Sequence, residues 1–220
     1  MLQWGEGGEV MEEKVLSIIE ILKDKYPDPV CALHYTKDYE LMIAVRLSAQ
    51  CTDARVNLIT PALFAAYPTL EAMASAPIEH VEELVHSCGF YKHKARDIVL
   101  ACQMLLQKHN GKVPGTMDEL LALPGVGRKT ANLLLGDLYQ EPGSVVCDTH
   151  CIRICGRLGL SQGKEPEKVE RQLRAILPPE ESSDFCHRIV LFGREVCTAR
   201  NPQCGHCPLR HLCKEFQPQE

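Results

Sequence analysis

The sequence has no apolar run long enough to cross a membrane. A membrane-spanning helix needs about 20 consecutive apolar residues, and even the apolar stretch 41–49 contains Arg46. Residues 1–10 also lack the basic segment followed by an apolar run that is typical of a secretory signal peptide. We therefore expect a soluble protein with no membrane partner. We place it in a reducing, intracellular setting, where its 12 cysteines need not form disulfides.

The chain also lacks an excess of positive charge. Its 29 acidic residues outnumber its 24 basic residues and give a net charge of −5, so the overall field does not attract nucleic acid. A nucleic-acid partner must therefore be held by local basic clusters. Each candidate cluster, taken alone, fits a solvated helix face equally well. The candidates are Lys92, His93, Lys94 and Arg96; Arg128 with Lys129; and Arg188, Arg194, Arg200, Arg210 and Lys214.

No segment shows the strict alternation of apolar and polar residues that is typical of a β-strand. Apolar residues instead recur at helical spacing, as at Val15, Ile18, Ile19 and Leu22. Prolines and glycines, Pro61 among them, divide the chain into about ten segments of ordinary helix length. The predicted fold class is all-α.

A glycine-containing turn stands out between two of these segments. Residues 123–132 read Leu-Pro-Gly-Val-Gly-Arg-Lys-Thr-Ala-Asn, so Gly125 and Gly127 flank Val126. Glycines permit a tight turn whose amide N–H groups approach an anion closely, and the helix that follows adds its positive dipole end and Arg128. This pattern predicts a cradle for a DNA backbone phosphate. It is not a P-loop, because arginine rather than glycine precedes the lysine. A plain connection between two helices is an equally good interpretation of the glycines alone.

Lys129 falls in the first turn of the predicted helix. A cation there faces the positive end of the helix dipole, at a cost of about 0.3–1 kcal/mol. That field, together with partial burial, favours the neutral amine that a nucleophilic lysine requires. The alternative is an exposed lysine that pairs with a phosphate group.

Asp148 stands at the start of another helical run, in the segment Val-Val-Cys-Asp-Thr-His at residues 145–150. Aspartate is a favoured N-cap residue, and capping alone explains its position. A carboxylate that faces Lys129 could also orient the amine, accept a proton and stabilise positive charge that develops on a sugar ring.

Four cysteines fall within 17 residues near the C-terminus, in the pattern Cys197-x6-Cys204-x2-Cys207-x5-Cys213. Such a group in a reducing compartment indicates a metal site. Four thiolates suit either Zn²⁺ or a [4Fe–4S] cluster, and the spacing does not distinguish the two. The other eight cysteines lie on apolar faces and are typical of core packing.

Taken together, these segments resemble the endonuclease III family of DNA glycosylases. The resemblance runs from about Met11 to Phe216 and includes Leu-Ser-Ala-Gln-Cys-Thr-Asp at residues 47–53. It implies a two-lobed helix–hairpin–helix glycosylase fold. Residues 31–140 would form a six-helix barrel lobe with the hairpin, and residues 11–30 and 141–220 an iron–sulfur cluster lobe. We expect residues 1–10 to be a poorly ordered leader.

The resemblance also implies a function. The chain would be a bifunctional DNA glycosylase and abasic-site (AP) lyase of base excision repair that excises oxidised or ring-saturated pyrimidines. Lys129 would attack C1′ of the flipped nucleotide and form a Schiff base, and β-elimination would cut the strand, with Asp148 assisting both steps. A [4Fe–4S] cluster would be held by Cys197, Cys204, Cys207 and Cys213. The expected DNA contacts are Gln50 and Phe90 inside the duplex, then Gly125, Val126, Gly127, Arg128, His150 and Arg200.

The resemblance makes the partner double-stranded DNA with damaged bases or abasic sites. We expect a monomer in the cytoplasm, associated with the nucleoid through DNA. Phe90 and Arg46 depart from the family pattern, which usually has leucine at the first position and an apolar residue at the second, so they leave the lesion preference open. One alternative is the adenine-excising branch, which lacks a lysine nucleophile; another is a non-catalytic DNA-binding module with a zinc site.

Overall fold

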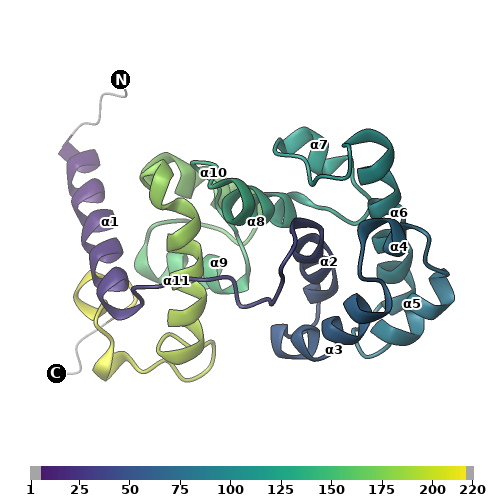
Figure 1. Ribbon diagram of the computed structural model, residues 1–220. Helices are drawn as coiled ribbons and strands as arrows, with labels where there is room; N and C mark the ends of the chain where they lie inside the picture. The colour runs from purple at the N-terminus through teal and green to yellow at the C-terminus, as the bar shows by residue number, and fades with distance from the viewer. Residues whose placement is uncertain (1–5, 217–220) are drawn as a thin grey trace. The chain divides into compact units, whose positions relative to one another are not determined.

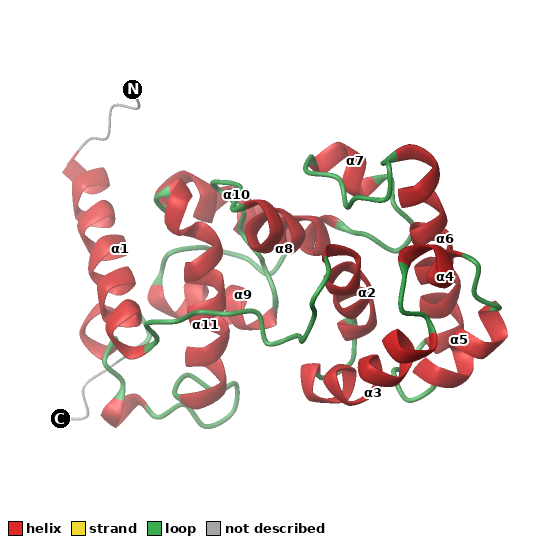
Figure 2. Ribbon diagram, in the orientation of Figure 1, coloured by secondary structure: helices red, strands yellow, loops and turns green. Residues whose placement is uncertain are grey.

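The computed structural model describes residues 6–216 and consists of helices joined by loops (Figure 2). It contains eleven α-helices and three short 3-10 helices, and no strand occurs between residues 6 and 216. This confirms the all-α fold class. None of the helices in this range combines the length and apolar character that a membrane crossing demands. The chain divides into two compact units, which we call the central unit (Cys31–Tyr139) and the terminal unit (Met1–Val30 with Gln140–Glu220).

The central unit contains seven of the helices (Figure 1). Helix α6 packs against α2, α4 and α5, while α2 also contacts α3 and α8, and α7 pairs with α8. Their apolar faces form one core. The helix bounds are α2 (Asp38–Ser48), α3 (Asp53–Ala66), α4 (Leu70–Ala74), α5 (Ile78–Val85), α6 (Tyr91–Lys108), α7 (Met117–Leu121) and α8 (Arg128–Tyr139).

Threonine caps explain where three of these helices begin. The side chains of Thr52, Thr69 and Thr116 accept the backbone N–H groups of Arg55, Ala72 and Glu119, respectively. Each cap satisfies one of the N–H groups that a helix start leaves without an intrahelical partner, which stabilises the helix by about 1 kcal/mol.

Pro61 lies inside α3 and does not separate two helices, so that part of the sequence interpretation is wrong. An interior proline removes one helical hydrogen bond and costs about 3 kcal/mol or more. The buried residues Val56, Thr60 and Leu63 lie on both sides of it. Burial of this face therefore holds the helix together across the proline.

Lys94 is not part of a surface cluster, contrary to the sequence interpretation. Only 1 % of it is exposed, and its Nζ donates a hydrogen bond to the Leu47 carbonyl at 2.9 Å. The Leu47 carbonyl belongs to the last turn of α2, where the helix dipole favours a cation. Lys94 thereby joins the start of α6 to the end of α2.

The terminal unit is built around α11 (Ser182–Glu195), which contacts both α1 and α9. Figure 1 shows α1 and the yellow C-terminal loop side by side, and both line one cavity. Gly193 permits a close approach between α11 and α9, because a Cβ there would lie 2.4 Å from the Nδ1 atom of His150. The remaining bounds are α1 (Glu6–Lys25), α9 (Thr149–Leu158), α10 (Pro166–Ile176), η1 (Pro179–Glu181), η2 (Cys204–His206) and η3 (Arg210–Leu212).

Arg188 is also buried and belongs to no basic surface, which corrects the sequence interpretation. It is 4 % exposed; its Nε donates to the Tyr26 carbonyl at 3.1 Å, and its Nη2 lies 3.4 Å from Asp184. These contacts hold the C-terminal end of α1 against α11.

Helix α1 begins at Glu6, inside the segment 1–10 that we expected to be poorly ordered. Residues 6–10 are therefore helical, and residues 1–5 lie outside the described part of the chain. The assignment of a six-helix barrel to residues 31–140 and of a cluster lobe to residues 11–30 and 141–220 stays a prediction.

Candidate functional site

The glycine turn joins α7 to α8 in the central unit. The Val126 N–H donates to the Leu123 carbonyl at 3.1 Å, and the Gly127 carbonyl accepts the Ala131 N–H at 2.9 Å, which starts α8. Leu123 and Val126 are buried in the core, whereas Gly125 and Gly127 are exposed. The apolar residues therefore anchor the turn, and the two glycines present its backbone to solvent.

Gly125 is required by the local geometry, and Gly127 is not. Gly125 has φ +74°, and a Cβ there would lie 2.5 Å from the Nε atom of Arg46 and 2.8 Å from Oδ2 of Asp97. A Cβ at Gly127 would meet nothing within 4 Å. Packing thus explains the first glycine, while the second leaves open space in front of the turn.

Arg46 and Asp97 form an ion pair against this turn. The Nε and Nη2 atoms of Arg46 donate to Oδ2 of Asp97 at 2.8 Å and 2.6 Å. In the sequence, Arg46 stands out only as an interruption of an apolar helix. Its partner Asp97 stands 51 residues away on another helix, so no local pattern reveals the ion pair.

Lys129 is the second residue of α8, and its side chain is exposed. The partial burial that we expected around its amine is therefore not present in the described structure. Its place in the first helical turn puts the amine at the positive end of the α8 dipole. The nucleophilic role of Lys129 stays a prediction.

Gln50 and Phe90 share an uncommon backbone conformation in the central unit. Their φ angles are +55° and +57°, and both side chains are exposed, Phe90 to 65 %. Residues other than glycine rarely adopt this left-handed region, which costs of order 1 kcal/mol or more and is enriched at functional sites; Asn110 and Gln140 also adopt it. Gln50 follows α2 and Phe90 precedes α6, so each stands at a helix end.

Asp148 lies in the terminal unit as the N-cap of α9. Its Oδ1 accepts the Cys151 N–H at 2.7 Å, and its backbone carbonyl accepts the Ile152 N–H at 3.0 Å. The capping role that the sequence suggested is thus present. The cap uses one carboxylate oxygen, and the half-buried side chain keeps Oδ2 for another partner. Its role in catalysis stays a prediction.

The two other expected DNA contacts in the terminal unit have different surroundings. His150 is half-buried, with Nδ1 3.2 Å from Nη2 of Arg153, and it packs against Gly193 of α11. Arg200 is exposed in the loop between Cys197 and Cys204. Packing against Gly193 explains the position of His150. Arg200, in contrast, is exposed to solvent. DNA binding by either residue stays a prediction.

Cys197, Cys204, Cys207 and Cys213 line a single cavity of about 190 Å³. In the described residues the four do not converge on a site for a single ion; they surround a space more than ten times the roughly 10–15 Å³ that one water needs. Burial raises the pKa of the Cys207 thiol, and the nearby Cys197, Cys213 and Cys204 raise it further, so the sulfurs are within electrostatic range. The cavity therefore has room for a group of several atoms.

Arg157 of α9 ties the start of this cysteine loop to its end. Its Nη1 donates to the Thr198 carbonyl at 2.9 Å and to the Cys197 sulfur at 3.3 Å, and its Nη2 donates to the Ala199 carbonyl at 3.2 Å. Its own carbonyl accepts the Lys214 N–H at 3.0 Å. The side chain and the backbone carbonyl of one residue therefore position both ends of the loop.

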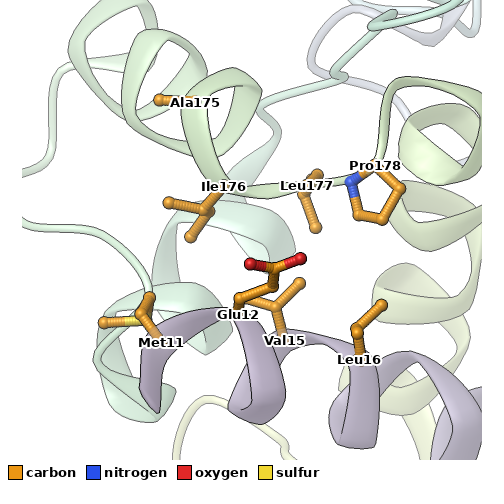
Figure 3. A pocket seen from close by; sticks show the side chains of 8 residues that line it. All are labelled: Met11, Glu12, Val15, Leu16, Ala175, Ile176, Leu177 and Pro178. Atoms are coloured by element: carbon orange, nitrogen blue, oxygen red, sulfur yellow. The ribbon is translucent and has the colours of Figure 1, made fainter. Parts of the chain in front are cut away.

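A separate cavity of about 270 Å³ lies between α1 and the end of α10 (Figure 3). Apolar side chains such as Val15, Leu16 and Ile176 line it, and the Glu12 carboxylate extends into it. None of the predicted site residues borders this cavity.

Two family models match the chain. The model described as HhH-GPD superfamily base excision DNA repair protein matches residues 43–179, and the iron-sulfur binding domain of endonuclease III matches residues 197–213. Endonuclease III of Synechocystis sp. is 44 % identical over 206 residues, which cover 94 % of each chain. Endonuclease III of Escherichia coli is 41 % identical over 91 % of this chain and 95 % of its own.

Solved structures agree with these relatives. A trapped endonuclease III–DNA covalent intermediate matches with a TM-score of 0.87 at 41 % identity, covering 98 % of both chains. A thermostable thymine-DNA glycosylase shares the fold, with a TM-score of 0.80 at 19 % identity over 93 % of this chain and 97 % of its own. These findings remove the alternative of a non-catalytic module with zinc. The chain belongs to the endonuclease III family of the HhH-GPD superfamily of base excision DNA repair proteins, and is a DNA glycosylase and AP lyase with a [4Fe–4S] cluster.

Proposed function

We propose that this enzyme removes oxidised or ring-saturated pyrimidines from double-stranded DNA and cuts the strand through a Schiff base on Lys129. The observation that carries the proposal is the position of this lysine. Lys129 is exposed and is the second residue of α8, directly after the glycine turn. A turn that binds a backbone phosphate would bring a sugar of the same strand to the amine.

The chemistry needs a neutral amine and a carboxylate. The Lys129 nitrogen bonds to C1′, the glycosidic bond breaks, and the base leaves with a proton. The sugar ring then opens to a protonated Schiff base; loss of a proton from C2′ expels the 3′ phosphate and breaks the strand. We assign Asp148 to proton transfer and to stabilising positive charge at C1′, through the oxygen that the helix cap does not use.

DNA contacts follow from the exposed features of each unit. In the central unit, the N–H groups of the turn and Arg128 bind a backbone phosphate, and Gln50 and Phe90 fill the space that the flipped nucleotide leaves. In the terminal unit, Arg200 contacts the backbone. Two solved structures that match 98 % of this chain at 41 % identity are covalent and non-covalent endonuclease III–DNA complexes, which supports these assignments. We propose that the enzyme acts as a monomer.

We assign Cys197, Cys204, Cys207 and Cys213 as the cluster ligands, because all four line the cavity described above. The role of the cluster would be structural, because it would fix the loop that carries Arg200. The chain's own contribution is the Arg157 clamp, which holds the loop at Thr198, Ala199 and Lys214.

Borohydride trapping on a duplex with one abasic site tests the nucleophile. The wild type is expected to form a covalent protein–DNA adduct and Lys129→Ala none. Arg128→Ala is the matched control: it weakens phosphate binding but keeps the amine, so its adduct should reappear at higher enzyme concentration. Equal trapping by Lys129→Ala and the wild type would assign the nucleophile to another residue.

A further inference from the structure

Two cysteines meet between the loops that carry Gln50 and Phe90. The Cys51 and Cys88 sulfur atoms lie 3.5 Å apart, although the residues are 37 positions apart in the sequence. Cys51 follows Gln50 in the loop between α2 and α3, and Cys88 lies in the loop between α5 and α6. Cys88 is fully buried, while Cys51 is half-buried and accessible to small solutes.

The surrounding contacts fix both loops. The Cys51 N–H donates to the Ser48 carbonyl at 3.0 Å, and the Cys88 N–H donates to the Val85 carbonyl at 2.9 Å. The buried Lys94 ammonium, bonded to the Leu47 carbonyl, joins the same two regions. Contacts other than those of the two sulfurs therefore hold the backbone of both loops.

Another close thiol pair in the described residues provides a contrast. The sulfurs of Cys151 and Cys155 lie 4.0 Å apart, but both residues are fully buried on consecutive turns of α9. A bond there would connect no separate segments. Cys51 and Cys88, in contrast, belong to different loops, and one of them is accessible.

We propose that Cys51 and Cys88 form an oxidation-sensitive dithiol whose disulfide ties the Gln50 loop to the Phe90 loop. The oxidant is a low-molecular-weight disulfide such as oxidised glutathione. The sulfurs must approach from 3.5 Å to about 2.05 Å, which displaces both loops slightly and then locks them. The effect on DNA rests on the proposed function, in which Gln50 and Phe90 enter the duplex; the formation of the disulfide does not.

The exchange takes two balanced steps. The Cys51 thiolate attacks the glutathione disulfide, forms a mixed disulfide and releases one glutathione thiolate. The Cys88 sulfur then attacks the Cys51 sulfur and releases the second, so two protein thiols are oxidised and one disulfide is reduced. Burial, and then the contact with Cys51, raise the pKa of Cys88 to about 11. Because Cys51 is less buried than Cys88, it reacts first, and the positive charges of Lys94 and Arg55, which lower the Cys88 pKa, favour the second step.

The test uses the cluster-loaded protein, treated with oxidised glutathione without oxygen while the visible absorbance of the cluster is followed. Mass spectrometry of unreduced peptides should find a Cys51–Cys88 cross-link that dithiothreitol removes. Incision of a lesion-containing duplex should fall at least threefold on oxidation and recover on reduction. Cys51→Ser should keep full incision under oxidant, and Cys88→Ser should form no cross-link and keep a glutathione adduct on Cys51. Cys31→Ser, which changes another half-buried thiol of the central unit, should respond as the wild type does.

Absence of the cross-link while the cluster stays intact would overturn the dithiol assignment, as would a glutathione adduct that remains on Cys51 of the wild type. A cross-link that leaves incision unchanged would overturn its effect on DNA. Failure of the reduced wild type to incise any duplex would instead contradict the proposed function, and the peptide result would still decide the dithiol assignment.

Discussion

Arg46 donates two hydrogen bonds to one carboxylate oxygen of Asp97, and the pair occupies the space that a side chain at residue 125 would need. Arg46 belongs to α2, Asp97 to α6, and the turn leads into α8. A contact among three helices thus fixes the position of the glycine turn. Arg46 and Asp97 are positioning residues, since they act through Gly125.

Gly125→Ala and Gly127→Ala should have different effects. At Gly125 the left-handed conformation costs an alanine about 1–2 kcal/mol, and the clash with Arg46 adds to this. The alanine at 127 meets open space and should change stability by no more than about 0.5 kcal/mol. Urea unfolding measures both. If residue 127 lies close to a phosphate, Gly127→Ala should still weaken DNA binding in a titration with abasic duplex.

The clash at Gly125 can be isolated with Arg46→Ala as a second change. In that background Gly125→Ala should lose less free energy of unfolding than in the wild type, because the contact with Arg46 is gone and only the backbone strain and the approach to Asp97 remain. Equal losses in the two backgrounds would show that the Arg46 side chain does not restrict the turn.

The Arg46–Asp97 pair should itself contribute to stability. Only 21 % of the Arg46 side chain and 25 % of the Asp97 side chain are exposed, so solvent screens the pair less than a surface ion pair. Hydrogen bonds to charged groups contribute about 1.5–3 kcal/mol. A double-mutant cycle with Arg46→Met and Asp97→Asn should give a coupling energy of about 1–2 kcal/mol. Additive effects of the two changes would contradict this.

Lys94 should make stability depend on pH. Burial lowers the pKa of Lys94 below its usual 10.5, so the unfolded chain holds this proton to a higher pH than the folded protein does. The stability of the wild type therefore rises with pH in the range just below 10.5, as the cost of the buried charge is relieved. Lys94→Met loses the bond to Leu47 and should be less stable by about 1–3 kcal/mol.

Urea unfolding of both proteins at pH 8, 9 and 10 measures the Lys94 effect. The advantage of the wild type over Lys94→Met should grow with pH. A gap that narrows over this range would show that the folded protein favours the charged form of Lys94.

Arg157→Ala should accelerate loss of the iron–sulfur cluster. The change removes three hydrogen bonds to the start of the cysteine loop, so the ligands lose their fixed spacing. The decay of visible absorbance in air should become several-fold faster. Arg171→Ala, which removes an exposed arginine of α10, is the matched control and should decay like the wild type.

Sequence patterns within about ten residues predicted much of this architecture. The glycine turn, the Asp148 cap and the cysteine spacing each depend on neighbouring residues, and local geometry follows from local sequence. The burial of Lys94 could also have been predicted from the sequence. Lys94 stands four residues before Ile98 and so lies on the same apolar face of α6.

Contacts between distant segments could not be predicted in this way. Arg46 with Asp97 and Cys51 with Cys88 join residues 51 and 37 positions apart, and their partners follow only from how helices pack. The left-handed backbone of Gln50 and Phe90 was missed for a related reason. Neither residue type favours that conformation, so the surrounding fold must impose it.

The closed cysteine loop has a consequence for maturation of the enzyme. Arg157 holds both ends of the loop through hydrogen bonds to the loop backbone, so part of the shape of the loop does not depend on its cysteines. Of the four thiols, only that of Cys204 belongs to a fully exposed residue. We therefore expect iron and sulfide to reach Cys204 before they reach the three half-buried thiols.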